Sequence, residues 1–448
     1  MASLATIPQV RGLPVVGNLP EFRFRRLELY LRIARECGDV GTYRVGPRTI
    51  VLLNSAELAH ELLVEKAEVF EKPAVLRVLA QPVLGNGLLT SANAFHRRQR
   101  RVVAPAFQHR RIAAYADVMA DYAEHIAELW PSGATIDVSR EMMRLTLWIV
   151  GKTLFDADVL NEAEELGRAL EIALRNFNSQ LSAFVPLPPT WPTPRNRRSA
   201  RAIARLDETV YRIIRERRAA GDDRGDLLSI LLQTSYEDDG TFMTDRQVHD
   251  EAMTLFLAGH ETTANALAWT WYLLARHPAI YARVRREAKE ALDGRTPTYA
   301  DLQKMPYALQ VLKETMRLFP PAPAIGREAA QDVEIGGHRI PAGTTVVISP
   351  YALHRRPDYF PDPQRFDPDR WTPEAEARLP RHAYLPFGGG LRICIGNHFA
   401  LMEGHIVLAT LAQRVGFQLV GRQRVIPEPL ITLRPRYGIR MSVERDVK

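Results

Sequence analysis

The sequence Phe387-Gly388-Gly389-Gly390-Leu391-Arg392-Ile393-Cys394-Ile395-Gly396 places one cysteine among several glycines, and a helical pattern follows from about His398. Glycines let the backbone pass close to a flat, bulky ligand, and the amides at the start of a helix favour an anion. A cysteine in this position, two residues from Arg392, is expected to have a lowered thiol pKa and to bind metal readily. The alternative is a small buried apolar side chain, which suits Cys37 better because no glycine cage surrounds it. The stretch therefore predicts that Cys394 is a metal ligand.

The composition is that of a large globular protein. The 448 residues are 46% hydrophobic and 25% charged, which allows a sizeable core without the bias of a fibrous or disordered chain. Cys37 and Cys394 are the only cysteines, so a disulfide framework is excluded, and neither has the CxxC spacing of a zinc site. The 59 basic residues are mixed with 52 acidic ones, which argues against a nucleic-acid-binding protein.

Targeting and membrane signals are weak. The most apolar long stretch, residues 252–275, contains His260, Glu261 and Asn265, which is typical of a buried helix and not of a membrane span. Residues 1–9 lack the basic and apolar regions of a signal peptide. We therefore expect a cytoplasmic protein with no transmembrane anchor in this chain.

The pattern along the chain predicts a mainly α fold with smaller β-sheets. We expect a single domain over residues 1–448, with a helical body over about 56–330, small β-rich regions over about 38–55 and 331–350, and C-terminal strands. Residues 40–45 and 49–53 read as a hairpin, and residues 333–335 and 344–348 as further strands. Five prolines, at positions 186, 188, 189, 192 and 194, predict an irregular connector.

One predicted helix is unusually long. Thr244 and Gln247 form a capping-box pattern and the next strong stop is His277-Pro278, so about thirty residues would span about 45 Å. Its centre, residues 258–263 (AGHETT), is a polar patch in an apolar segment. Gly259 is a poor helix former and Thr262 can bond a carbonyl one turn earlier, so we expect local distortion. The segment alone is also compatible with a buried helix whose polar groups are satisfied.

A further helix ends before Pro320-Pro321 and carries Glu314 and Arg317. Side chains three residues apart share a helix face, so these two charges can pair. Arg370, in a loop interrupted by prolines, lies shortly before Cys394 in the sequence.

Together these motifs resemble those of the cytochrome P450 superfamily, and the similarity runs from the proline- and glycine-rich start to the last strands. The cysteine-loop pattern is matched by Phe387, Gly390, Arg392, Cys394 and Gly396, the structural triad by Glu314, Arg317 and Arg370, and the oxygen-activation motif by residues 258–263. The resemblance implies a P450 fold, with haem b held between the long central helix and the Cys394 loop. Electron donation from a cysteine thiolate favours O–O cleavage over O2 storage.

The resemblance also implies roles for individual residues. Thr262 would orient water above the iron and Glu261 would relay protons. The haem propionates would be held by His96, Arg100, Arg327 and Arg392, since buried carboxylates need charged donors. The expected substrate pocket comprises Thr254, Leu255, Leu257, Ala258, Ala324 and Ile325.

The activity implied is monooxygenation of a lipophilic small molecule, such as a fatty acid, terpenoid or steroid-like compound, with O2. A ferredoxin or flavodoxin-type donor with its reductase would supply electrons. Arg97, Arg98 and Arg101 are a solvated face or help to dock such an acidic donor. Two other functions stay open at this point: a cysteine hydrolase using His398 or His405 as base, and a helical binding module without redox chemistry.

Overall fold

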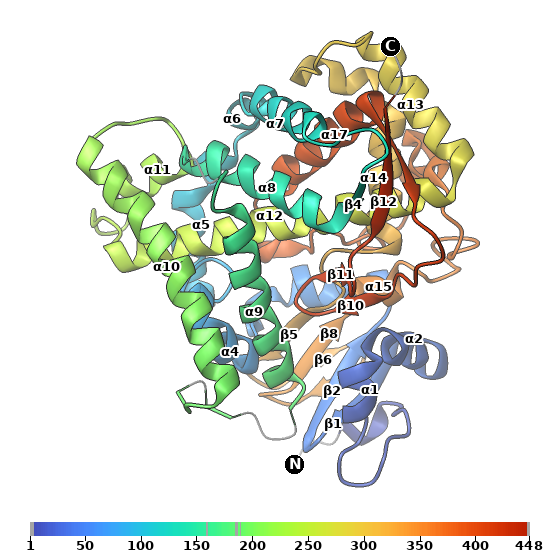
Figure 1. Cartoon of the computed structure of the whole chain (residues 1–448). Helices are drawn as coiled ribbons and strands as arrows, with labels where there is room; N and C mark the ends of the chain where they lie inside the picture. Colours follow the sequence, from blue (N-terminus) through green and yellow to red (C-terminus); the bar gives the residue numbers. More distant parts are fainter. Residues whose placement is uncertain (1–3, 158–159, 184–186, 189, 446–448) are drawn as a thin grey trace.

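The computed structural model describes residues 4–157, 160–183, 187–188 and 190–445. Most of these residues are helical, and the helices form a body beside a mixed sheet (Figure 1). The helices are α1 (Leu19–Phe24), α2 (Arg26–Cys37), α3 (Ala56–His60), α4 (Ala74–Leu84), α5 (Asn93–Val103), α6 (His109–Ala113), α7 (Ala116–Glu128), α8 (Val138–Phe155), α9 (Ala163–Leu181), α10 (Pro194–Ala220), α11 (Leu227–Gln233), α12 (Asp245–Arg276), α13 (Pro278–Leu292), α14 (Pro306–Leu318), α15 (Pro350–Leu353), α16 (Pro373–Glu376) and α17 (Asn397–Arg414).

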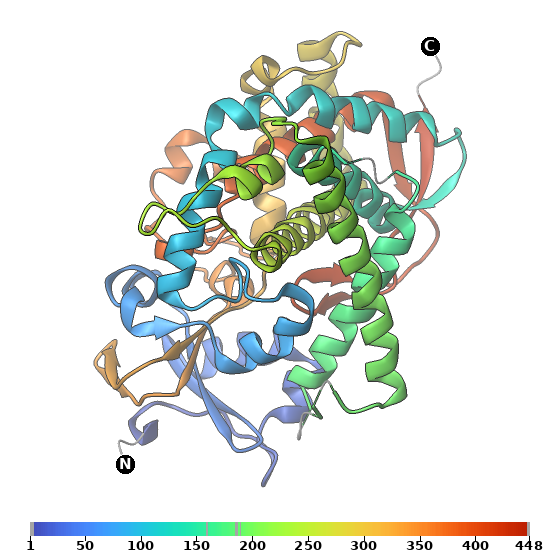
Figure 2. The same ribbon diagram turned by 90° about the vertical axis from the view of Figure 1, so that its left-hand side faces the viewer.

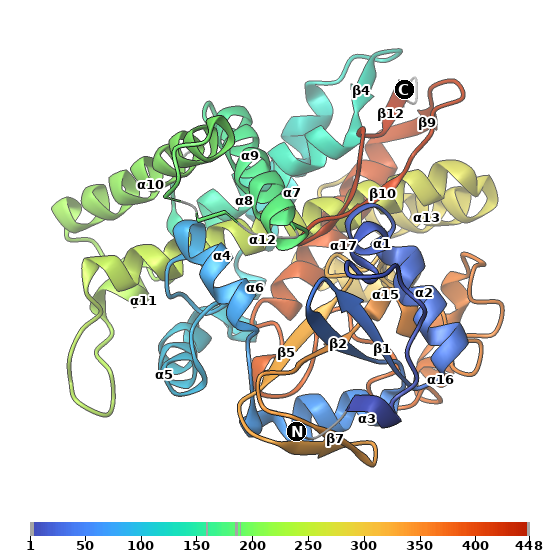
Figure 3. The same ribbon diagram turned by 90° about the horizontal axis from the view of Figure 1, so that it is seen from below.

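The strands are short and are gathered into small sheets. They are β1 (Val40–Val45), β2 (Arg48–Leu53), β3 (Phe70–Glu71), β4 (Thr135–Asp137), β5 (Ile325–Ala329), β6 (Val333–Ile335), β7 (His338–Ile340), β8 (Thr345–Ile348), β9 (Val415–Leu419), β10 (Pro427–Pro429), β11 (Leu433–Pro435) and β12 (Arg440–Arg445). The largest sheet has the order β1-β2-β8-β5-β3, with β2 and β8 parallel. It lies under the helical body (Figure 3).

The long predicted helix is present as α12. Thr244 caps it through the capping box with Gln247, and it extends for 32 residues to Arg276. It runs through the helical body (Figure 1) and is seen nearly end-on in Figure 2. Its residues 248–257 and 263–271 are buried throughout, because α8, α10, α14 and α17 pack around it. The helix is continuous at Gly259, so the expected distortion does not interrupt it.

Other predicted elements are found within one residue of their expected ends. The hairpin of β1 and β2 pairs Val45 with Arg48 across a turn in which Gly46 has φ 61°. Strand β5, in contrast, lies inside the range 56–330 that we assigned to the helical body. Its pairing partners are β3 and β8, so non-local pairing and not local pattern creates this strand.

The proline-rich connector is described only in part. Pro186 and Pro189 lie outside the described residues, whereas Pro194 occupies the first turn of α10 and Thr193 caps that helix. Proline is tolerated there because the first helical amides have no partner within the helix. Among the described helices, none is long and apolar enough to cross a membrane.

The core places the Cys394 loop against the central helix. Helix α17 begins at Asn397 and packs against α7, α12, α13 and α14. Phe387, at the start of the loop, packs with Ala266 of α12 and with Leu312 and Met316 of α14. The cysteine loop is therefore fixed at both of its ends by buried helices.

Candidate haem-thiolate site

The Cys394 loop has a tightly constrained backbone. The amide of Cys394 donates to the carbonyl of Phe387 at 2.9 Å, which closes the loop. Gly388 and Gly390 have φ values of 71° and 65°, in the left-handed region that favours glycine. A Cβ atom at Gly390 would lie 1.6 Å from the carbonyl oxygen of Leu63. Glycine is therefore required at Gly390 both by its conformation and by the close approach of another backbone segment.

The pKa of the Cys394 thiol differs from the sequence-based expectation. Burial raises this pKa, and the amide of Gly396 and the charge of Arg100 lower it only in part. Arg392, from which the lowered pKa was inferred, instead directs Nη2 to the carbonyl of Ser91 at 2.8 Å. The prediction of a lowered pKa was therefore wrong for the protein alone. The amide and the guanidinium still provide the favourable contacts that a metal-bound thiolate needs.

The central helix offers two accessible side chains at its middle. Ala258 is exposed, and Gly259 and Thr262 are partly exposed, although residues 248–257 and 263–271 are buried. Because α12 lies inside the helical body, this exposure is to an interior space. The hydroxyl of Thr262 donates to the carbonyl of Ala258 at 2.8 Å, the one-turn contact that the sequence allowed. The two residues thus form a small ledge with one hydroxyl group.

Glu261 lies on a different face of α12 from Thr262. It is buried, and its Oε1 accepts a 2.6 Å hydrogen bond from the hydroxyl of Thr432. Thr432 in turn accepts a bond from the side-chain amide of Asn265 at 3.3 Å. Burial raises the pKa of Glu261, while Thr432 and Arg434 partly oppose that shift. The carboxyl group can therefore hold a proton at higher pH than an exposed glutamate does.

Cationic side chains converge beside the Cys394 loop. A pocket there is lined by His96 of α5, Arg327 of β5 and Arg392, together with Arg97 and Leu391. Burial and the charge of Arg392 lower the pKa of Arg327 to about 10. Burial, followed by the neighbouring cations, lowers the pKa of His96 to about 3. The positive charges of Arg327 and Arg392 therefore lie close together in a buried place beside the Cys394 loop.

Arg327 and Arg392 form no ion pair with a carboxylate in the part of the chain that the structure describes. The charge of Glu71 acts on Arg392 from a distance, and Nη1 of Arg392 is buried without a hydrogen-bond partner. Lys72, which the sequence analysis did not identify, belongs to the same cluster, since burial and then Arg327 and Arg392 lower its pKa well below the usual value. Arg100 contacts the loop itself, donating to the carbonyl of Ile393 at 2.7 Å.

The donor set fits iron protoporphyrin. A buried cationic cluster with an unpartnered guanidinium nitrogen suits the two propionates, because buried cations need anions. A neutral His96 can still donate one N–H bond to a carboxylate. The glycine-rich backbone suits a flat macrocycle, and Cys394, which keeps exposed surface as a residue although its thiol is desolvated, suits the iron.

The residues expected to line the pocket have different surroundings. Thr254 is buried, and its hydroxyl points to the carbonyl of Leu84 at 3.5 Å. Leu255 and Leu257 are both buried in the main apolar cluster. Ala324 and Ile325 are partly exposed, and Cδ1 of Ile325 lies 3.8 Å from the Cβ position of Gly388. Of these four apolar residues, Ile325 is thus placed beside the cysteine loop.

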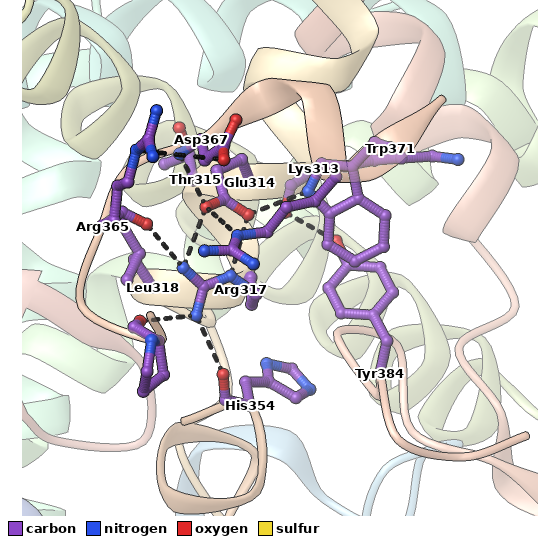
Figure 4. Close-up of polar contacts among 12 residues, drawn as sticks. Lys313, Glu314, Thr315, Arg317, Leu318, His354, Arg365, Asp367, Trp371 and Tyr384 are labelled. Carbon is purple, nitrogen blue, oxygen red and sulfur yellow. Dashed lines mark hydrogen bonds and ion pairs between the residues drawn. The ribbon is translucent and has the colours of Figure 1, made fainter. Parts of the chain in front are cut away.

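The charged pair of α14 forms a dense buried network (Figure 4). Nε and Nη2 of Arg317 each donate to Glu314 at 2.8 Å, and both side chains are fully buried. Arg317 also donates to the carbonyls of His354, Pro363 and Arg365. Every donor of this guanidinium group therefore has an acceptor.

Arg370 makes the weakest contact within the expected triad. Its Nε lies 3.6 Å from Oε1 of Glu314, too far for a hydrogen bond, and its side chain is partly exposed. Glu314 instead accepts bonds of 2.9 Å from the amide of Asp367 and the indole N–H of Trp371. Trp371, adjacent to Arg370 in the sequence, is thus a network member that the motif did not reveal.

His354 connects this network to the cysteine loop. Its carbonyl accepts from Arg317 (Figure 4), and its Nε2 accepts from the amide of Leu385 at 2.8 Å. Burial lowers the pKa of His354 to about 3, so the ring stays neutral and Nε2 stays an acceptor. Leu385 is two residues before Phe387, so the ion pair supports the loop that carries Cys394.

The alternatives from the sequence gain little support from the geometry. Nε2 of His405 is occupied by the carbonyl of Met305 at 2.7 Å, and burial lowers the pKa of this histidine to about 4. It is therefore unsuited to be the base of a cysteine hydrolase. His398 is exposed.

The arginines of α5 that the sequence left as a solvated face or a docking face all lie near acidic residues. Arg98 pairs with Asp238 at 3.2 Å and Asp239 at 2.7 Å, and Arg97 and Arg101 each lie within 4 Å of a glutamate.

Comparison with known proteins identifies the family. The model of the family described as "Cytochrome P450" matches residues 7–441. Cyclooctatin synthase of Streptomyces melanosporofaciens is 41% identical over 95% of this chain and 91% of its own length. Cyclooctat-9-en-7-ol 5-monooxygenase of the same organism is 38% identical over 90% and 87%, and pentalenene oxygenase of Streptomyces avermitilis is 35% identical over 95% and 92%. The chain therefore belongs to the cytochrome P450 family, as a haem b monooxygenase that uses O2 and a redox partner to oxidise a lipophilic small molecule.

Proposed function

We propose that this chain hydroxylates a carbocyclic terpenoid. The observation that carries the proposal is the set of relatives, because the names of two of them denote oxygenation of a cyclic alkene and of a cyclic alkenol. Both align over most of their length. The ledge of Ala258 and Thr262 in a helix that is otherwise buried and mostly apolar supports a hydrocarbon skeleton as substrate, since apolar ligands bind in apolar cavities.

The residues of the site have the following proposed roles. When bound, the haem supplies the reductive activation of O2 and the insertion of one oxygen atom into the substrate. Cys394 is its thiolate ligand, and His96, Arg100, Arg327 and Arg392 hold its propionates, with Lys72 as a further cation. Thr262 orients water beside the reacting molecules through its hydroxyl group.

Glu261 is proposed to hold the protons that the reaction consumes. The raised pKa of its buried carboxyl group supports this role, since a proton donor must be protonated near neutral pH. Thr432 is its hydrogen-bond partner and would pass protons to or from it. Glu314, Arg317 and Arg370 are proposed to support the Cys394 loop without touching the substrate.

Electrons are proposed to come from a separate ferredoxin or flavodoxin-type donor with its reductase. The matched family model spans residues 7–441, which leaves little of this chain for a reductase segment. The cytoplasmic location stays a prediction.

The substrate class is tested by titrating the purified holoprotein with cyclic terpene alkenes, terpene alcohols, fatty acids and steroids. Displacement of iron-bound water shifts the haem absorption band, so binding is read directly. We expect the cyclic terpenoids to give the largest shift and, with a ferredoxin and its reductase, one hydroxylated product. Saturable binding of a fatty acid or steroid alone would contradict the terpenoid assignment.

A further inference from the structure

Two consecutive acidic residues of α12 hold the loop between α4 and α5. We call residues 85–92 the 85–92 loop. Oδ2 of Asp250 accepts from the amide of Asn86 at 2.8 Å, and Oε2 of Glu251 accepts from the amide of Leu88 at 3.0 Å. Both acids are buried. A buried amide is costly to leave without an acceptor, so these two contacts fix the loop backbone.

The loop approaches α12 so closely that only glycine fits at two positions. A Cβ atom at Gly87 would lie 2.3 Å from Oγ1 of Thr254, and one at Gly85 would lie 2.0 Å from Cγ of Asp250. Gly85 also has φ 53°, which favours glycine. The loop is thus packed directly on the helix, and the two carboxylates are surrounded by backbone.

The contact continues the row of residues that reaches the site. Asp250, Thr254, Ala258 and Thr262 follow one another at intervals of four along α12, so they form one ridge on the helix surface. The last two form the ledge with the accessible hydroxyl group, Asp250 bonds the loop, and Thr254 lies against Gly87 of the loop. The 85–92 loop therefore lies along α12 next to the ledge.

The other end of the loop is tied to the cysteine loop. Nη2 of Arg392 donates to the carbonyl of Ser91 at 2.8 Å and to Oδ1 of Asn93 at 2.9 Å. The 85–92 loop thus spans from the central helix to the cationic cluster.

We propose that Asp250 and Glu251 are positioning residues that latch the 85–92 loop over the substrate space and thereby limit which molecules enter. The inference rests on the monooxygenase site and does not depend on the terpenoid assignment. Oε1 of Glu251 supports it, because this buried oxygen has no hydrogen-bond partner among the described residues. A latch with an unsatisfied oxygen costs free energy to keep closed, so the loop can be released.

The latch is expected to respond to pH. Burial, with the charge of Asp250, raises the pKa of Glu251 to about 8, and the amide of Leu88 opposes this shift in part. The titratable groups facing Glu251 are Asp250 and Tyr236, and Arg98 lies over the Tyr236 ring at 3.7 Å. Asp250 also meets Arg246 at 3.0 Å and His249 at 3.2 Å, and His249 reaches Asp207 of α10 at 3.0 Å.

The sign of the pH effect follows from proton uptake on closing. Glu251 binds its proton more tightly in the closed loop than when water reaches it, so the closed form is fully favoured at low pH. This advantage falls as the pH rises toward about 8 and is constant above it. Asp250 is the second acceptor for the loop, through the amide of Asn86.

The experiment measures association of 4-phenylimidazole with the ferric holoprotein, with carbon monoxide binding to the ferrous protein as a small-ligand reference. We expect Glu251→Ala to accelerate azole association about tenfold, the effect of losing one buried hydrogen bond of about 1.4 kcal/mol. Carbon monoxide binding should not change. Gly87→Ala, which forces the loop away from Thr254, should act in the same direction.

The matched control is Glu287→Ala. Glu287 accepts from the amides of Tyr307 and Ala308 at 2.8 Å each, so it has the same chemistry between α13 and α14 and no contact with the 85–92 loop.

Glu251→Gln keeps an acceptor oxygen and cannot ionise. In the parent protein, the rate of azole association should rise between pH 6 and 8 and stay constant above pH 8. In Glu251→Gln, this rate should not change with pH.

Equal azole rates in Glu251→Ala and Glu287→Ala, or a pH response retained by Glu251→Gln, would overturn the latch. Should Glu251→Ala fail to retain haem, the comparison of the parent with Glu251→Gln decides alone. The carbon monoxide band of each variant is measured first. A variant that shows this band has an intact haem site, so its azole rate then tests the latch.

Discussion

Two groups of buried charges lie beside the Cys394 loop, and they differ in how they are satisfied. The Glu314–Arg317 pair has a protein partner for every guanidinium donor. The cluster of Arg327, Arg392 and Lys72, with the neutral His96 beside them, contains no acidic side chain, and one nitrogen of Arg392 has no partner in the described chain. Fully paired charges stabilise a fold, whereas buried cations without anions indicate where an anionic ligand belongs. The difference separates residues that support the site from residues that bind its cofactor.

The largest effect is expected at the ligand itself. Cys394→His should abolish the red-shifted carbon monoxide band of a thiolate-ligated haem and with it the monooxygenase activity, because imidazole donates less charge to iron. The measurement is the difference spectrum of the reduced protein. A band unchanged from the parent protein would exclude Cys394 as the ligand, and the distinction between the two charged groups would then lose its basis.

The next effect tests the paired group. Glu314→Ala strands the buried guanidinium of Arg317 and should lower the free energy of unfolding by about 3–5 kcal/mol, with or without haem. Urea titration of the apoprotein and holoprotein measures it. Normal stability in both forms would show that the carbonyls around Arg317 are enough to stabilise its buried charge. Arg370→Ala provides the graded control, and its smaller loss is expected because Arg370 lies 3.6 Å from Glu314.

Substitutions in the cationic cluster should have the opposite effect from substitutions in the Glu314–Arg317 pair. Arg327→Gln removes one of several mutually repelling cations, so the apoprotein should be at least as stable as the parent. Haem affinity should fall about tenfold, the effect of one lost charge-assisted bond. Haem transfer to apomyoglobin measures the affinity. Loss of apoprotein stability with unchanged haem affinity would reverse the assignment of this cluster.

The smallest structural effect is expected at Thr262. Its hydroxyl bonds only within α12, so Thr262→Ala should leave haem content and stability unchanged. Product formed per electron consumed should fall and peroxide should rise, since the alanine cannot orient water. Thr263→Ala, whose hydroxyl bonds Gly259 at 3.4 Å on a buried face, is the neighbouring control. Equal coupling in Thr262→Ala and the parent would remove this residue from the reaction.

The local parts of the site were predictable because short sequence spacing determines them. Glu314 and Arg317 are three residues apart on one helix, and the Thr244–Gln247 box begins α12 where the pattern placed it. The left-handed φ values of Gly388 and Gly390 likewise belong to a local turn. The pairing of β5 and the contact of Trp371 with Glu314 were not predictable in this way, since no spacing rule links them.

The sequence by itself determined the family motifs, the long central helix, the candidate ligand Cys394 and the cationic residues His96, Arg327 and Arg392. Only the tertiary structure decided that Thr432 bonds Glu261 across 171 positions, that Lys72 joins the cationic cluster, and that Asp250 and Glu251 hold the 85–92 loop. It also decided that burial outweighs nearby positive charge at the Cys394 thiol. The physical reason is that desolvation and long-range contacts depend on how distant segments pack, and side-chain identity alone does not contain that information.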